Sequence, residues 1–90
     1  MKPIRWTIHA ERKAAEREVP RAEVELTVRR PESAVAGEPP RRIHMRRYTD
    51  ATLQSPMLLR VVVEETPTEL VVVTLYKTSK FGKYEPSPRP

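Results

Sequence analysis

The sequence contains no cysteine and only two glycines among its 90 residues. The absence of cysteine excludes disulfide bonds, thiolate zinc sites and a cysteine nucleophile. Two glycines are too few for a glycine-rich loop that cradles phosphate groups. The two histidines, His9 and His44, and the scattered carboxylates do not have the spacing of metal ligands. We therefore expect neither a metal ion nor a cofactor.

Nucleophilic serines and long apolar runs are also missing. The serines at positions 33, 55, 79 and 87 lie in turn or tail contexts, and none belongs to a nucleophile motif. No apolar run approaches the length of a membrane span, and no signal-peptide pattern opens the chain. These absences argue against a triad-type hydrolase and against a membrane partner. They predict a cytoplasmic protein.

Positive charge is present in excess. Seventeen Lys and Arg residues against twelve Asp and Glu residues leave a net charge of +5. An anionic partner, most often a nucleic acid, is the first expectation, and the alternative is that the charge only keeps the protein soluble. The length predicts one domain with a single core. We expect that domain over residues 1–84, followed by a disordered, proline-rich tail over residues 85–90.

Two short segments rich in Val and Leu, Met57–Val63 and Leu70–Tyr76, predict the centre of the fold. Each is too short for a typical helix, and Glu64–Glu69 between them has the proline and carboxylates of an exposed turn. The pattern therefore predicts a β-hairpin. Because side chains alternate across a strand, one face of this hairpin would be entirely apolar. The odd-numbered residues of this predicted core face are Met57, Leu59, Val61, Val63, Val71, Val73 and Leu75.

The segments that precede the hairpin contain two candidate helices. Thr7 can cap a helix over Ile8–Glu18, which consists of strong helix formers. Pro20–Arg30 is ambiguous, because its apolar residues alternate with polar ones as in a strand. Its first residue, Pro20, and its basic end nevertheless suit a helix. The pattern leaves this segment open between strand and helix.

Two further strands are predicted between these segments and the hairpin. Ser33–Glu38 reads as a short edge strand, and Arg41–Tyr48 reads as a longer strand. In the longer strand Ile43 and Met45 would join the core. Thr49–Pro56 is rich in turn-forming residues and is predicted to be a loop.

A polar face follows if the strands share one sheet without a bulge. Its residues would be the even-numbered Arg42, His44, Arg46, Tyr48, Arg60, Thr74 and Tyr76. Arginine side chains bind phosphate groups bidentately, and tyrosine rings stack on unpaired bases. This face is therefore a candidate surface for single-stranded RNA. The alternative is an ordinary solvated face of an antiparallel sheet.

Several of these residues carry a family resemblance. These residues are Ile8-His9-Ala10 and Arg17 in the first predicted helix, then Val19, Val24 and Pro31, and finally the stretch Val-Val-Thr-Leu-Tyr-Lys-Thr-Ser-Lys at the end of the predicted sheet. Over about residues 7 to 84 it resembles small domains of the RelE/ParE/BrnT toxin superfamily. The resemblance implies an α+β fold with two N-terminal helices packed on one face of a three- to four-stranded antiparallel sheet. It assigns Pro20–Arg30 to a helix.

The same resemblance implies an activity. Active members are metal-independent endoribonucleases that cut messenger RNA, often on the ribosome, and a separate antitoxin protein neutralises them. By position, His9 matches the helix histidine of the family, and Thr74 and Tyr76 match its Thr-x-Tyr in the last strand. Lys77 and Lys80 match the basic residues that follow. The partners that the resemblance implies are messenger RNA and an antitoxin protein.

Cleavage of this kind asks for an acid, a base and fixed cations, because a ribose 2′-hydroxyl attacks the neighbouring phosphate. His9 and Tyr76 are the candidates for proton transfer, and strand alternation adds Arg46 and Arg60 as candidates for phosphate binding. The predicted catalytic residues are His9, Tyr76 and Arg60. The chain lacks the Gly-x-x-Arg-Leu-type stretch that is common in active RelE toxins. Two alternatives are therefore kept, a non-catalytic RNA-binding domain and a protein-interaction module.

Overall fold

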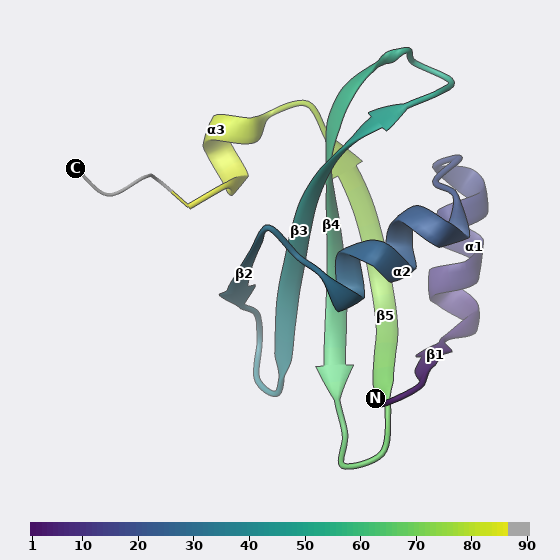
Figure 1. Cartoon of the computed structure of the whole chain (residues 1–90), viewed down its shortest axis with the longest axis vertical. Helices are drawn as coiled ribbons and strands as arrows, with labels where there is room; N and C mark the ends of the chain where they lie inside the picture. Colours follow the sequence, from purple (N-terminus) through teal and green to yellow (C-terminus); the bar gives the residue numbers. More distant parts are fainter. Residues whose placement is uncertain (87–90) are drawn as a thin grey trace.

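The computed structural model describes residues 1–86. Within them the chain forms five strands and three helices around one sheet (Figure 1). In chain order these are β1 (Ile4–Trp6), α1 (Ile8–Glu16), α2 (Arg21–Arg29), β2 (Ser33–Ala36), β3 (Arg41–Asp50), β4 (Ser55–Glu65), β5 (Leu70–Thr78) and α3 (Phe81–Tyr84). The strand order is β1-β5-β4-β3-β2. No helix in this part of the chain is long and apolar enough to cross a membrane.

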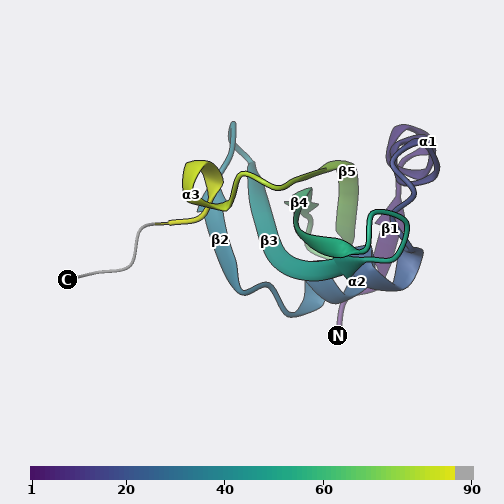
Figure 2. The same ribbon diagram turned by 90° about the horizontal axis from the view of Figure 1, so that it is seen from above.

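The predicted α+β class is confirmed, but the predicted sheet is wrong in detail. The sheet has five strands instead of three or four, and it is mixed, because β1 runs parallel to β5 while the other pairs are antiparallel. The helices also do not share one face. Figure 2 shows α2 below the sheet and α1 at the side of the sheet where β1 and β5 lie. Three-residue β1 is too short to leave a sequence pattern, and its pairing with β5 exists only in the folded chain.

Both helices begin and end for local reasons. The Thr7 hydroxyl accepts a hydrogen bond from the backbone nitrogen of Ala10 at 3.0 Å, which caps α1 as expected. α1 ends two residues before the predicted Glu18, because Glu18 adopts a left-handed φ of 55°. The helix predicted for Pro20–Arg30 is confirmed, with Pro20 as the residue before its first turn.

The alternation that suggested a strand in α2 has a simple explanation. Val24 and Val28 are four residues apart, so they lie on the same side of the helix, and both are buried against the sheet. Ala22 and Leu26 alternate with them in the sequence but are exposed. The four residues therefore divide between the core and solvent, as a helix requires.

The connection between β3 and β4 is shorter than the predicted loop Thr49–Pro56. β3 continues to Asp50 and β4 begins at Ser55, so residues 51–54 form the turn. This turn sets a register in which even residues of β3 pair with odd residues of β4, such as Tyr48 with Met57. Paired residues point to the same side of the sheet. The prediction that residues of equal parity in the two strands share a face is therefore wrong.

This register also moves two predicted core residues. Met45 pairs with Arg60, and Ile43 pairs with Val62, on the side of the sheet opposite to α2. Met45 is fully buried there, outside the main apolar cluster, and Ile43 is half-buried. Ile43 and Met45 therefore do not join the core next to α2.

A β-bulge in β5 changes the faces a second time. Val62 pairs with Thr74 while Val63 pairs with Val72, so Val73 has no partner in β4. On the C-terminal side of the bulge Leu75 faces the main core, and on its N-terminal side Val72 does so. The prediction that Val71 and Val73 belong to the main core is wrong for this reason.

The main core lies between α2, α1 and one face of the sheet. It is an apolar cluster of buried side chains against which Ile4, Trp6 and Leu70 also pack. The cluster consists of Ala10, Ala14, Val19, Val24, Val28, Tyr48, Met57, Leu59, Val61, Val63, Val72 and Leu75. The four predicted odd residues of β4 all belong to it.

The chain after β5 folds back over the other face of the sheet. Short helix α3 lies on that side, opposite to α2 (Figure 2). Glu85, the first residue of the tail predicted to be disordered, forms an ion pair with Arg47 of β3 at 2.7 Å. Residues 87–90 of that predicted tail lie outside the described residues.

Candidate functional site

The sheet divides the predicted polar residues between its two faces. We call these the α2 face and the α3 face, after the helix that lies on each. Strand register places Arg60, Thr74 and Tyr76 on the α3 face. It places the remaining strand residues of the predicted set on the α2 face, namely Arg42, His44, Arg46, Tyr48 and Lys77. The single polar face predicted from alternation therefore does not form, because the β3–β4 turn shifts the register by one residue.

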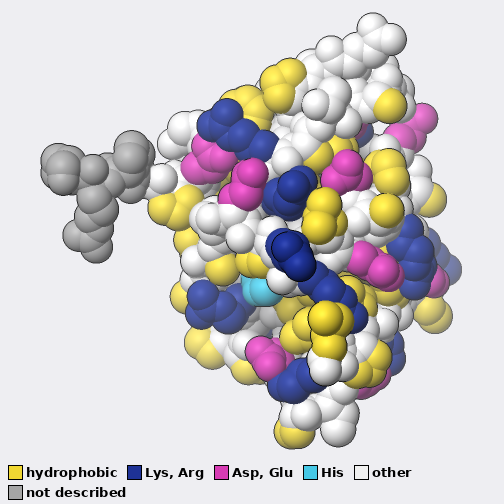
Figure 3. All heavy atoms as spheres, in the orientation of Figure 1, with side chains coloured by type: hydrophobic (Ala, Val, Ile, Leu, Met, Phe, Trp, Pro, Cys, Tyr) yellow, Lys and Arg dark blue, Asp and Glu magenta, His cyan; other side chains and the backbone are white. Residues whose placement is uncertain are grey.

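Most of the residues on the α2 face bind to the protein itself. Nδ1 of His44 lies 3.0 Å from the backbone oxygen of Val28 in α2, and the Arg46 guanidinium donates to the carbonyl of Arg47 at 3.3 Å. Exposed Arg42 lies near the edge of this face. On the surface that carries α2, basic side chains are interspersed with acidic ones (Figure 3). This face does not present a continuous basic surface.

Asp50, Tyr48 and Lys77 form a polar cluster at the β3–β4 end of the α2 face. The Asp50 carboxylate is almost fully buried and accepts hydrogen bonds from Lys77 at 2.5 Å, from the Tyr48 hydroxyl at 3.0 Å and from the Leu53 backbone nitrogen at 2.9 Å. The Lys77 bond, followed by the other two, lowers the pKa of Asp50 to about 2. Burial, with the bond to Asp50, raises the pKa of Tyr48. Lys77 therefore joins β5 to the β3–β4 turn.

Removal of the Asp50 carboxylate is expected to cost less stability in acid than at neutral pH. The folded pKa of about 2 lies below the reference value of 3.8. A carboxylate with a lowered folded pKa stabilises the native state above its unfolded pKa, and this contribution is lost as pH falls through the folded value. The difference in free energy of unfolding between wild type and Asp50→Asn, measured in urea, should shrink as pH falls from above 3.8 to about 2. A difference that does not change with pH would contradict this assignment.

On the α3 face, Arg60 lies between two tyrosines. We call Arg60, Tyr76 and Tyr84 the Arg60 cluster. Arg60 and Tyr76 are directly paired across β4 and β5, and the guanidinium donates a hydrogen bond to the Tyr76 hydroxyl. Its central carbon lies 4.9 Å from the centroid of the Tyr76 ring and 4.2 Å from that of Tyr84. The two rings meet edge to face, with centroids 6.4 Å apart. Both ring faces thus contact the cation.

Arg60 has no anionic partner in the described part of the chain. Its side chain is buried, with 7% of the residue exposed, and no carboxylate of residues 1–86 forms an ion pair with it. Its Nε atom is buried and has no hydrogen-bond partner there. Burial lowers the pKa of Arg60, and Tyr84 partly opposes this effect. A buried cation without a counter-ion is costly, so this site is one that an anion would stabilise.

His9 reaches the same face from α1. Its Nε2 atom lies 3.0 Å from the Thr74 hydroxyl. Thr7 holds the start of α1 against β5, because its backbone nitrogen and hydroxyl donate to the carbonyls of Val72 and Val73 at 3.2 and 3.0 Å. His9 therefore stands at the edge of the sheet next to β5.

These contacts form one row across the α3 face. Thr74 and Tyr76 lie two residues apart on the same strand face, about 7 Å along the strand, and Arg60 pairs with Tyr76. The row therefore runs from His9 through Thr74 and Tyr76 to Arg60. The structure brings the three predicted catalytic residues into one row, although it separates them from most of the predicted RNA-binding residues.

Helix α3 and its neighbours add residues to the α3 face that were not predicted from the sequence. Arg47 of β3 binds the Glu85 carboxylate bidentately at 2.7 and 2.8 Å, and its guanidinium lies 4.2 Å from the centroid of the Phe81 ring. Tyr84 completes the Arg60 cluster. Predicted Lys80 is exposed just before α3, where its backbone nitrogen donates to the Thr78 hydroxyl. The only sequence signal for α3 is the pair of aromatic residues three positions apart.

Neither a metal-binding group nor a similar known protein was found. Among residues 1–86 no group of three or more His, Asp or Glu side chains is arranged to hold a metal ion. Comparison of the chain with protein-family models, with curated proteins and with solved structures gave no match.

Proposed function

We propose that the α3 face binds single-stranded RNA and that the protein is a RelE-like, toxin-type endoribonuclease that acts on messenger RNA without a metal ion. The observation that carries the proposal is the state of Arg60. This arginine is buried between two tyrosine rings and has no carboxylate partner within residues 1–86. An RNA phosphate would supply both the missing negative charge and an acceptor for the unpaired Nε.

The tyrosines give the same surface a preference for unpaired bases. Single-stranded RNA is bound through phosphate contacts and through stacking of splayed bases on aromatic rings. Tyr76 and Tyr84 offer such rings next to the cation, and the net charge of +5 favours association with a polyanion. A duplex would keep its bases stacked inside and would gain only the phosphate contact.

A cleavage step can be written for the row His9–Arg60. Nε2 of His9 lies 3.0 Å from the Thr74 hydroxyl, and in the tautomer that leaves this nitrogen without a hydrogen it takes the proton of the ribose 2′-hydroxyl. The 2′-oxygen then bonds to phosphorus as the bond to the 5′-oxygen breaks. Tyr76 accepts a hydrogen bond from Arg60, so its own hydrogen remains available for the leaving 5′-oxygen. Arg60 would stabilise the charge on the phosphate.

Helix α3 must move for a phosphate to reach Arg60. Tyr84 covers the guanidinium, and Glu85 already occupies the neighbouring cation, Arg47. α3 has only four residues and no buried side chain, so its detachment exposes little apolar surface. We include this opening in the proposal, together with an antitoxin protein that neutralises the activity and the ribosome as a place of action.

The RNA-binding part is tested by the salt dependence of affinity. We expect the affinity of Arg60→Gln for a fluorescent single-stranded RNA to be roughly tenfold lower than that of wild type at low salt. For single strands the slope of log K against log salt is about −0.7 per phosphate neutralised, so the variant should lose about that much of the slope. Fluorescence anisotropy over a salt series measures both quantities, and circular dichroism checks the fold.

Arg42→Gln is the matched control. It removes the same charge from an exposed position on the α2 face, so it should leave the slope unchanged. Equal losses in Arg60→Gln and Arg42→Gln would mean that RNA responds only to net charge. The proposal that RNA binds through the α3 face would then be wrong, even if the protein cleaves RNA.

A further inference from the structure

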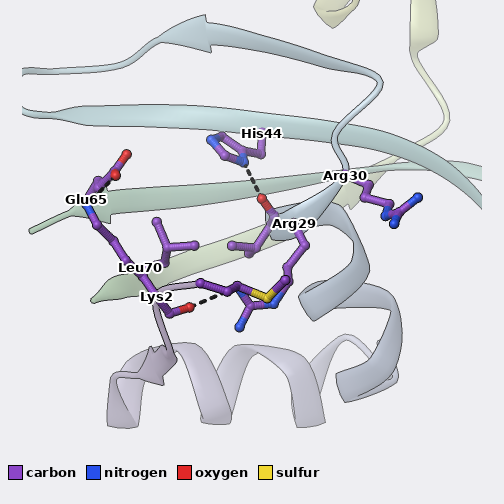
Figure 4. A pocket seen from close by; sticks show the side chains of 8 residues that line it. Lys2, Arg29, Arg30, His44, Glu65 and Leu70 are labelled. Carbon is purple, nitrogen blue, oxygen red and sulfur yellow. Dashed lines mark hydrogen bonds and ion pairs between the residues drawn. The ribbon is translucent and has the colours of Figure 1, made fainter. Parts of the chain in front are cut away.

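A separate cavity opens on the α2 face, away from the Arg60 cluster. Its volume is about 540 Å³, which is within the usual range for small-molecule sites. The wall comes from the N-terminal segment, the end of α2, and strands β3, β4 and β5 (Figure 4). The lining residues are Met1, Lys2, Val28, Arg29, Arg30, His44, Glu65 and Leu70.

The charges of this lining favour an anion. Glu65 is the only acidic lining residue, and it is already paired with Lys2 at 2.5 Å. Arg29 donates one hydrogen bond, to the Lys2 carbonyl at 2.9 Å, and no carboxylate of residues 1–86 pairs with it. A guanidinium has five N–H donors, so most of those on Arg29 remain available. Arg30 extends away from the other lining side chains in Figure 4 and adds only distant positive charge.

The rest of the wall is largely apolar. Val28 is buried in the core and Leu70 packs against it. The His44 ring is held by its bond to the Val28 carbonyl, as Figure 4 shows. Because a carbonyl oxygen only accepts, Nδ1 of His44 carries a proton, and the ring keeps one orientation. A ligand here would meet the Arg29 guanidinium beside an apolar surface.

We propose that this cavity binds a small amphipathic anion, namely a carboxylate with a short aliphatic chain. Its carboxylate binds the Arg29 guanidinium, and its chain lies against Val28, Leu70 and the His44 ring. This proposal does not depend on RNA binding, because the cavity and the Arg60 cluster lie on opposite faces of the sheet.

Hexanoate is the probe, and the measurement is a titration of the ¹⁵N-labelled protein followed by amide chemical shifts. We expect saturable shifts at Val28, Arg29, His44 and Leu70. Acetate lacks the aliphatic chain and should bind roughly tenfold more weakly than hexanoate. Hexanol keeps the chain but lacks the charge that binds the Arg29 guanidinium, so it should also bind more weakly than hexanoate. Equal binding of hexanoate and either analogue would overturn the proposal, as would shifts that do not saturate.

Two arginine variants locate the carboxylate. Arg29→Gln should weaken hexanoate binding by about tenfold. Arg17→Gln, which removes an exposed charge from the end of α1 outside the cavity, should leave it unchanged. Equal effects of the two substitutions would contradict binding at Arg29.

Discussion

RNA incubated with the purified protein in excess chelator is expected to be cut and to carry cyclic 2′,3′-phosphate ends. An internal 2′-hydroxyl nucleophile needs only proton transfer and stabilisation of charge, which His9, Tyr76 and Arg60 can provide without a metal ion. DNA and RNA with 2′-methoxy groups lack the nucleophile and should remain intact. Free RNA and translating ribosomes should both be tested, because the proposed function includes the ribosome as a place of action.

Two substitutions test the acid and the base. We expect His9→Ala and Tyr76→Phe each to slow cleavage by roughly 10²–10⁴-fold, the usual effect of losing a proton-transfer group. Tyr76→Phe keeps the ring that would stack on a base, so RNA affinity should change far less than the rate. Tyr48→Phe is the matched control. It removes a hydroxyl that binds Asp50 on the opposite face and should leave the rate unchanged.

The outcomes separate the enzymatic proposal from its alternative. Cleavage that both variants retain in full would show that His9 and Tyr76 do not transfer the protons. An absence of cleavage on free RNA and on ribosomes, with RNA binding through Arg60 intact, would contradict the enzyme and favour a non-catalytic RNA-binding domain. The burial of Arg60 beneath Tyr84 does not separate the two, because it shields the phosphate site from any RNA until α3 moves.

Leu59→Ala is expected to lower the free energy of unfolding by about 2–5 kcal/mol. Leu59 is fully buried in the middle of β4 and belongs to the main apolar cluster. Its truncation removes buried apolar surface and leaves a cavity that the surrounding sheet and helices fill only in part. Small domains are stable by only about 5–15 kcal/mol, so the loss is a large fraction of the total. Urea denaturation followed by circular dichroism measures it.

Leu53→Ala provides the same chemical change at an exposed position. Leu53 lies in the β3–β4 turn and is 55% exposed, so its truncation should change the free energy of unfolding by no more than about 0.5 kcal/mol. Similar losses in the two variants would mean that Leu59 does not occupy a closely packed site. The placement of the main core against α2 would then be wrong.

Much of the secondary structure could be predicted from the sequence because its causes are local. Thr7 caps α1 through a bond to a residue three positions away, and Val24 and Val28 have the spacing of a buried helix side. The odd residues of β4 alternate as a half-buried strand requires. For Pro20–Arg30, however, alternation and end signals disagreed. The prediction of a helix there depended on the family resemblance.

Which residues share a face was decided by tertiary structure. The four-residue turn after Asp50 pairs even residues of β3 with odd residues of β4, and the bulge at Val73 shifts β5 by one position. A one-residue shift moves a side chain to the opposite side of a sheet. Alternation within a strand is visible in the sequence, but the pairing between strands is not. The expected grouping of His44 and Tyr48 with Arg60 failed for this reason.

The candidate site shows the same division. The types of residue were evident from the sequence, since a histidine in the first helix and a Thr-x-Tyr in the last strand can be read directly. Their contacts depend on β5, because Thr7 anchors α1 to this strand and Arg60 of β4 pairs with Tyr76 of β5. Tyr84 reaches Arg60 only because the chain turns back over the sheet after β5. The sequence by itself determined which chemical groups this protein has, and the tertiary structure decided which of them meet, because register and chain reversal join residues that are distant along the chain.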